Sequence, residues 1–363
     1  MARAIARVDL DAVAHNVRTL AAAAPGTRLC VVVKANGYGH GAVACARAAR
    51  AAGAQWLAVA GAQEAADLRT AGIEGPLLVL GVLDAEDLAI ALDADADICV
   101  WDEGFLATLP ARARVHVKLD SGMGRLGTRD PDQATRVAEE AGPRLVGAMT
   151  HFATADDRAS GFFDEQLARF TAWVTPLRAA RPDLLVHAAN SAATLRDPAA
   201  HFDMVRPGIA IYGLDPFGED AAARSLRPAL TLSSHVAAVK ACAAGQSAGY
   251  GRRFIATRDT LLATVPIGYG DGWRRATTNR ADVRIGDDDF PQVGTVSMDN
   301  ITVDLGPSGA GVQVGDEVVL VGPALSAETV AARSDTINYE VTTALLARTQ
   351  RVYHRSGVPA APA

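Results

Sequence analysis

The chain has 363 residues, of which 49% are hydrophobic and 21% are charged, and its formal net charge at pH 7 is -6. This length predicts about two domains, and the apolar content is sufficient for a large core. The basic residues are scattered, and the absence of a Lys/Arg block argues against nucleic acid and favours a small charged metabolite as the partner.

The cysteines and the N-terminal segment indicate the cellular compartment. The four cysteines show no CxxC pair and no metal-ligand spacing, so we expect reduced thiols in a cytoplasmic protein without a metal site. The segment MARAIARVDLDAVAHN has no apolar run typical of a signal peptide. No window approaches the roughly 20 apolar residues of a membrane helix, so no membrane partner is expected.

In chain order, helical patterns alternate with short apolar runs through the first two thirds of the sequence. A helix over 10–24 comes first, because its apolar residues recur at helical spacing. Eight runs then predict strands, at 29–33, 56–60, 76–80, 97–100, 114–119, 145–150, 184–189 and 203–208. Helices are expected between them, at 41–52, 63–71, 85–92, 132–141 and 162–180. This alternation predicts a (β/α)8 TIM barrel, with a doubly wound open sheet as the alternative.

After Pro228 the pattern changes to short, Gly-punctuated, Val/Thr-rich segments, which is typical of all-β structure. Ser326 is expected to cap a helix that ends at Ala332, and 339–347 also has a helical pattern. A last strand is expected at 348–353, followed by a loose tail at 356–363. We therefore predict two domains, a barrel over 1–228 and a mainly-β domain over 229–363.

Polar residues follow five of the eight predicted barrel strands, at the end where barrel enzymes carry their active sites. Each residue alone has an ordinary interpretation, such as a solvated lysine, a structural histidine, a helix cap or a surface arginine. Independent surface residues would not gather at one end of one sheet, so the set predicts a site. Its members are Lys34, Lys118, Arg125, His151, Asn190, Ser191, Arg206, Gly208 and Ile209.

The residue types at these strand ends suit a phosphorylated carbonyl cofactor. Backbone N–H groups of Gly208 and Ile209 and the Ser191 hydroxyl follow the last two strands, where barrels commonly bind phosphate. Lys34 could form a Schiff base, helped by a pKa that burial on an apolar strand would lower. Pyridoxal 5'-phosphate fits this combination.

Nine motifs then identify a family resemblance. VVVKANGYGHG, KLDSGMGRLG, THFATAD, NSAAT, VRPGIAIYGL, AGYGRRF, IGYGDGW, VSMDN and NYE occur in this order. From about Ile5 to Tyr353 the chain resembles bacterial alanine racemase, a fold type III pyridoxal-phosphate enzyme. The resemblance implies an isomerase that interconverts L- and D-alanine for peptidoglycan. It also implies a head-to-tail homodimer whose subunits share their active sites.

The resemblance also assigns roles residue by residue. Lys34 resembles the lysine that carries the cofactor and acts as one base, and Tyr250 resembles the second base, supplied by the other subunit. Lys118 matches a lysine that is often carbamylated. Cofactor-binding positions are matched by Tyr38, His151, Asn190, Ser191, Arg206, Gly208, Ile209 and Tyr339. Substrate-binding positions are matched by Arg125, Tyr269, Met298 and Asp299.

Other readings of the same fold stay open at this point. A racemase acting on serine or another amino acid would share most of these motifs. A type III decarboxylase would need a carboxylate in the role of Arg206 and would lack Tyr250. A single-domain pyridoxal-phosphate-binding protein would lack the β domain. Ser297 is one departure, since relatives often carry cysteine before the MDN motif.

Overall fold

The computed structural model describes residues 3–360, and its contacts divide the chain into two compact units. The barrel unit contains residues 13–37 and 42–211. The sheet unit contains the residues up to 12, residues 38–41, and the chain from 212 onward. The proposed boundary at residue 228 stays a prediction, and this division assigns 212–228 to the sheet unit.

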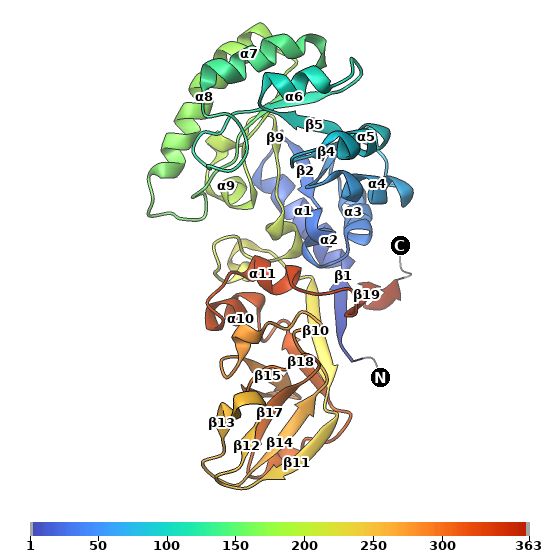
Figure 1. The fold of residues 1–363 in the computed structure, drawn as a ribbon, viewed down its shortest axis with the longest axis vertical. Coiled ribbons are helices and arrows are strands. Elements are labelled where there is room, and N and C mark those ends of the chain that lie inside the picture. Colours follow the sequence, from blue (N-terminus) through green and yellow to red (C-terminus); the bar gives the residue numbers. More distant parts are fainter. Residues whose placement is uncertain (1–2, 361–363) are drawn as a thin grey trace. The chain divides into compact units, whose positions relative to one another are not determined.

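The barrel unit is a closed barrel of parallel strands, which confirms the predicted fold and excludes the open sheet (Figure 1). Neighbouring strands follow chain order, and the last pairs with the first through Arg28↔Met204 and Leu29↔Val205. Each strand is short and almost wholly buried, as expected for parallel strands covered by helices. The strands are β2 Arg28–Val32, β3 Trp56–Val59, β4 Leu77–Val79, β5 Asp97–Val100, β6 Val115–Lys118, β7 Leu145–Met149, β8 Leu185–His187 and β9 Met204–Val205.

Helices connect these strands, and several begin at aspartate caps. Asp84, Asp102 and Asp130 each accept a hydrogen bond from a backbone N–H in the first turn of the helix that follows. All predicted helices are present, and two short ones, α6 and α9, were not predicted. The helices are α1 Leu10–Ala23, α3 Ala42–Ala51, α4 Ala62–Thr70, α5 Ala85–Asp93, α6 Glu103–Thr108, α7 Pro131–Ala141, α8 Phe162–Ala180 and α9 Ser191–Arg196.

The sheet unit is built on a ten-stranded sheet in the order β11-β14-β17-β16-β15-β18-β10-β1-β19-β20, with a separate pair β12-β13. The expected all-β character is therefore confirmed. Its strands are β1 Ile5–Asp9, β10 Leu230–His235, β11 Ala238–Cys242, β12 Ser247–Ala248, β13 Phe254–Ile255, β14 Thr260–Val265, β15 Asp282–Ile285, β16 Asp288–Val293, β17 Ile301–Gly306, β18 Glu317–Val321, β19 Gln350–Arg355 and β20 Val358–Ala360. Its helices are α10 Ala327–Arg333, which Ser326 caps as predicted, and α11 Asn338–Thr343.

Three features of the sheet unit differ from the sequence-based expectations. The N-terminal residues form β1, which was not predicted and which pairs antiparallel with β10 and parallel with β19. Helix α11 ends before the predicted residue 347, because the backbone N–H of Leu346 donates to the carbonyl oxygen of Asp271 instead. The tail was expected to be loose, but 358–360 form β20, since Ser356 and Gly357 adopt the positive φ angles of a tight hairpin turn. The predicted loose residues 361–363 lie outside the described residues.

The four cysteines are free and buried. Burial raises the pKa of Cys45 to about 12. Among residues 3–360, no helix is long and apolar enough to cross a membrane.

Candidate active site

Lys34 begins α2 (Lys34–Tyr38), a single turn with a left-handed backbone. Ala35, Asn36 and Tyr38 all have φ near +50°, and such conformations cost about 1–3 kcal/mol for each residue other than glycine. Two hydrogen bonds hold the turn within the barrel unit. The Ala35 N–H donates to Oε1 of Glu64 at 2.6 Å, and the Ala42 N–H donates to Oδ1 of Asn36 at 3.0 Å. Strained backbone of this kind is concentrated at functional sites, which makes this turn a candidate.

The Lys34 ammonium group stands at the carboxyl end of the barrel, two residues beyond β2. Its side chain is half-buried. Burial, together with the positive charge of Arg125, lowers the pKa of Lys34 below its ordinary value. Lys34 therefore carries a larger neutral fraction near pH 7 than an exposed lysine, as a nucleophilic amine requires.

Arg206 follows β9 and is buried at the same end of the barrel. Nη2 donates to the carbonyl oxygens of Thr150 at 2.7 Å and Ala188 at 3.0 Å, and Nη1 donates to Nδ1 of His187 at 2.7 Å. A guanidinium has five N–H groups, so these three bonds leave one on Nε and one on Nη1 for another acceptor. Burial lowers the pKa of Arg206 to about 10, so the group stays a cation and a donor at neutral pH.

Ser191 and the residues after β9 form a candidate anion cradle. The Ser191 hydroxyl oxygen accepts the backbone N–H of Gly208 at 2.9 Å and that of Ala210 at 3.3 Å. Because the oxygen is used twice as an acceptor, its own hydrogen remains to be donated to an anion. Asn190 caps α9 by accepting the Ala193 N–H at 3.0 Å, which holds Ser191 at the start of the helix.

Lys118 and His151 complete the polar set of the barrel unit. Lys118 is the last residue of β6 and is buried, and burial lowers its pKa. His151 lies two residues beyond β7, and burial together with the positive charges of Arg206 and Lys118 lowers its pKa well below the ordinary value. His151 is therefore neutral at physiological pH. Arg125, in the loop after β6, is exposed.

The sheet unit brings together two of the predicted phosphate-binding tyrosines. The ring of Tyr38 lies 6.2 Å from that of Tyr339 and 5.1 Å from that of Tyr212, measured between centroids. The backbone at Gly39 passes very close to α11, since a Cβ on Gly39 would collide with the carbonyl group of Thr342. This position requires glycine both for its space and for its φ of +85°.

Tyr250 lies in a different part of the sheet unit, in a turn with positive φ at Gly249, Gly251 and Arg252. Its backbone carbonyl accepts the hydroxyl of Thr295 at 2.6 Å. Its side chain is 72% exposed, which is unusual for a tyrosine held in a constrained turn.

Tyr269, Met298 and Asp299 are also brought together in the sheet unit. The N–H of Tyr269 donates to the carbonyl of Ser297 at 3.1 Å, and the Gly270 N–H donates to that of Met298 at 2.9 Å. Asp299 accepts from Arg348 at 2.6 Å. The side chains of Tyr269 and Met298 are exposed.

Several residues that support this arrangement were not predicted from the sequence. Glu64 anchors the left-handed turn, and Arg348 orients Asp299. The barrel interior also holds Asp97, His116 and His187, all buried. Their only sequence signal is a polar residue inside an otherwise apolar strand, in DICV, VHVK and LVH.

The chain is similar over nearly its whole length to known proteins. Two family models match it, "Alanine racemase, N-terminal domain" over residues 8–216 and "Alanine racemase, C-terminal domain" over residues 229–353. The alanine racemase of Symbiobacterium thermophilum is 42% identical and that of Frankia casuarinae 41%, and the alignments cover 96% and 97% of this chain and 96% of each relative. The crystal structure of alanine racemase from Streptomyces lavendulae superimposes with a TM-score of 0.91 at 38% identity, covering 98% of this chain and 97% of the other.

Proposed function

The chain belongs to the alanine racemase family, and on that premise we propose that it interconverts L- and D-alanine with pyridoxal 5'-phosphate held at Lys34. The observation that carries this proposal is the convergence at the carboxyl end of one barrel. A lysine with a lowered pKa, a serine hydroxyl free to donate and a buried arginine with two unused N–H groups all lie there.

The donor set fits this cofactor. The Lys34 amine would bond covalently to the aldehyde carbon of the cofactor. The Ser191 hydroxyl and the Ile209 N–H would bind its phosphate. Arg206 would face the pyridine nitrogen. When bound, pyridoxal phosphate serves as a sink for the electron pair left on Cα.

Two bases account for a reaction that changes only the configuration at Cα. A proton removed from one face must be replaced on the other, so one base stands on each face. We assign Lys34 to one face and Tyr250 to the other. The lowered pKa of Lys34 supports its role, since the neutral amine is the form that accepts a proton.

Arg206 explains why the reaction would stop at proton exchange. A guanidinium only donates, so a pyridine nitrogen that accepts from Arg206 stays unprotonated. An unprotonated ring withdraws electrons less strongly, which disfavours side reactions such as transamination. A decarboxylase would need a carboxylate in this role, and residue 206 is an arginine.

We further propose a homodimer in which each subunit supplies Tyr250 to its partner's barrel. The sheet unit exposes Tyr250, Ile255, Tyr269 and Met298, all large apolar or aromatic side chains. Exposure of several such side chains on one unit is typical of a surface that another subunit covers. Tyr269, Met298 and Asp299 would then border the substrate entrance.

Lys118 is proposed to carry a carbamate. Its lowered pKa supplies the neutral amine that attacks carbon dioxide, with loss of one proton to water. The product is an anion among the cations Arg125 and Arg206, whose positive charges themselves lower the pKa of the unmodified lysine. An anion here would orient Arg125 toward a substrate carboxylate.

The biological role proposed is supply of D-alanine for peptidoglycan in the cytoplasm, and a racemase of the same fold acting on serine is the alternative. A deuterium-exchange racemisation assay over a panel of amino acids, with added cofactor, separates the two substrates. Borohydride reduction tests the site directly, because the chain has only three lysines, Lys34, Lys118 and Lys240. Reduction should fix the cofactor on the Lys34 peptide, and labelling at Lys240 or Lys118 instead would reject the assignment.

A further inference from the structure

A row of polar side chains crosses the otherwise apolar interior of the barrel. Oδ2 of Asp97 lies 3.1 Å from Nε2 of His116, and Nδ1 of His116 lies 2.8 Å from Nε2 of His187. Nδ1 of His187 then meets Nη1 of Arg206 at 2.7 Å. All four residues are at most 3% exposed, so the contacts are shielded from water.

The row runs from one end of the barrel to the other. Asp97 is the first residue of β5, and His116 is the second residue of β6. His187 is the last residue of β8, and Arg206 directly follows β9. Because the strands are parallel, these positions climb from the amino end of the barrel to the carboxyl end, where Lys34 lies.

The chemistry of the two end groups permits only one arrangement of protons. Arg206 can only donate, so Nδ1 of His187 must accept, and its proton must be on Nε2. That proton points at Nδ1 of His116, which must also accept, so His116 is protonated on Nε2. This last proton is donated to the carboxylate of Asp97, which can only accept. Both imidazoles are thereby neutral, and the lowered pKa of His187 agrees with this.

The packing around His116 prevents it from rotating out of the row. Gly147 on β7 pairs with His116 in the strand register. A Cβ at residue 147 would lie 2.8 Å from Cγ of His116 and 2.5 Å from Cε1, so only glycine leaves room for the imidazole. On another side, the ring of Trp56 meets that of His116 edge-on, with centroids 5.8 Å apart.

We propose that Asp97 and His116 are positioning residues for the reaction, because they set the tautomer of His187 and so hold Arg206 as a donor aimed at the cofactor. This inference rests on the proposed function, in which Arg206 faces the pyridine nitrogen. It assigns a role to two residues remote from the site, whose effect passes through hydrogen bonds alone.

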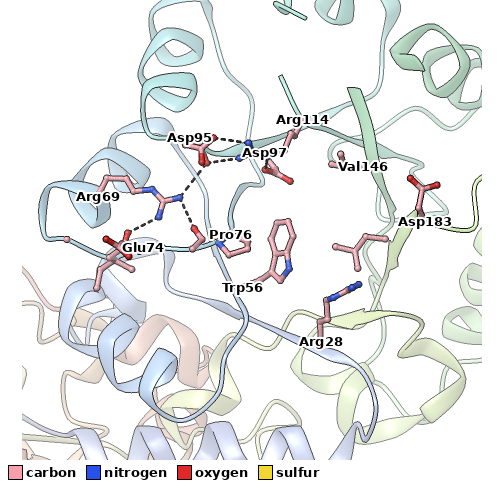
Figure 2. Close-up of a pocket in the computed structure, with 14 residues that line it drawn as sticks. Arg28, Trp56, Arg69, Glu74, Pro76, Asp95, Asp97, Arg114, Val146 and Asp183 are labelled. Atoms are coloured by element: carbon pink, nitrogen blue, oxygen red, sulfur yellow. Dashed lines mark hydrogen bonds and ion pairs between the residues drawn. The ribbon is translucent and has the colours of Figure 1, made fainter. Parts of the chain in front are cut away.

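The far end of the row opens on a cavity of about 880 Å³ at the amino ends of the strands. Asp95, Asp97 and Arg114 meet at one side of this cavity, and Trp56 also lines it (Figure 2). Nε of Arg114 donates to Oδ1 of Asp97 at 2.5 Å, which leaves Oδ2 for His116. Arg114 thus orients the Asp97 carboxylate along the row.

Asp97→Asn is the informative change because Arg114 fixes the direction of the new amide. The amide oxygen stays toward Arg114, so the NH2 group faces Nε2 of His116. A donor then stands at each end of the row, so one link must fail. If Asp97 sets the tautomers, His116 and His187 both move their proton from Nε2 to Nδ1, which places an N–H of His187 against an N–H of Arg206. Asp183→Asn is the matched control, since Asp183 lines the same cavity but pairs with Arg181 outside the row. Asp97→Glu tests rescue by a retained carboxylate.

The primary measurement is ¹⁵N NMR of labelled histidines in the cofactor-free protein. We expect wild type and Asp183→Asn to show both His116 and His187 protonated on Nε2, and Asp97→Asn to show both protonated on Nδ1. In cofactor-loaded enzyme, Asp97→Asn should lower kcat roughly tenfold with a smaller change in KM. A loss of this size is typical when a residue that orients a functional group through hydrogen bonds is removed. Asp97→Glu should recover part of this loss.

A wild-type His187 protonated on Nδ1 would overturn the inference without any variant, even if Asp97→Asn failed to fold. Unchanged tautomers in Asp97→Asn would overturn it as well. Reversed tautomers with the kcat of the control would show that the row does not position Arg206 for the reaction. An inactive wild type would reject the proposed function, and the NMR result on the cofactor-free protein would still decide whether the row is ordered.

Discussion

Gly147→Ala should destabilise the barrel strongly, although it adds a single methyl group. That methyl would lie 2.8 Å from Cγ and 2.5 Å from Cε1 of His116, a side chain with no exposed surface. Overpacking of this kind costs about 1–3 kcal/mol. The imidazole would also have to shift, and the loss of one of its bonds, to His187 or to Asp97, adds about 1 kcal/mol. We therefore expect a loss of about 2–4 kcal/mol in unfolding free energy.

The assay is thermal unfolding of the cofactor-free protein by circular dichroism, because bound cofactor would add its own stabilisation. At roughly 2–4 °C per kcal/mol, the melting temperature should fall by about 4–16 °C. Gly161→Ala is the control, since Gly161 has φ of -74° and no atom within 4 Å of its added Cβ. If both variants melted like wild type, the tight fit around His116 would be refuted.

Three further predictions concern the site. Tyr250→Phe should slow deuterium exchange from L-alanine by about 10²–10⁴-fold and from D-alanine far less, and equal losses would contradict a base on each face. Ser191→Ala should weaken cofactor affinity by about 10- to 150-fold, the loss of one hydrogen bond to a charged group, and an unchanged Kd in an absorbance titration would exclude the anion cradle. Because the pKa of Lys34 is lowered, its neutral fraction is larger at a given pH. Reductive methylation of the cofactor-free protein, followed by mass spectrometry, should therefore modify Lys34 at lower pH than exposed Lys240. If the two lysines were modified over the same pH range, the lowered pKa of Lys34 would be contradicted.

The secondary structure of the barrel was largely predictable because its signals are local. Runs such as LCVVV and PLLVL read as buried parallel strands, and helical spacing identified the helices between them. The short helices of the barrel unit were missed, since six residues such as those of α6 and α9 carry too little periodicity. The strand β1 was missed for another reason, because its partners β10 and β19 lie more than 200 residues away in the chain.

The predicted site residues of the barrel unit lie at the carboxyl ends of its strands, and the details of their hydrogen bonding were not predictable. The N–H of Gly208 was expected to hold a phosphate directly, whereas it donates to Ser191, whose hydroxyl is the group proposed to bind the phosphate. Similarly, the left-handed turn after Lys34 has no signature in KANGY that separates it from an ordinary loop. Its hydrogen bonds include one from the Ala35 N–H to Glu64, which is 29 residues away in the chain.

The sequence by itself determined the alternation of strands and helices, the change to β structure after Pro228 and the placement of Lys34 and Arg206 directly after strands. These follow from periodicity and from residue order, which are local properties. Only the tertiary structure decided that Asp97, His116 and His187 form one proton-ordered row that ends at Arg206. In a linear sequence each is an isolated polar residue in an apolar strand. Closing the barrel turns all of them inward and excludes water, so they have to satisfy one another.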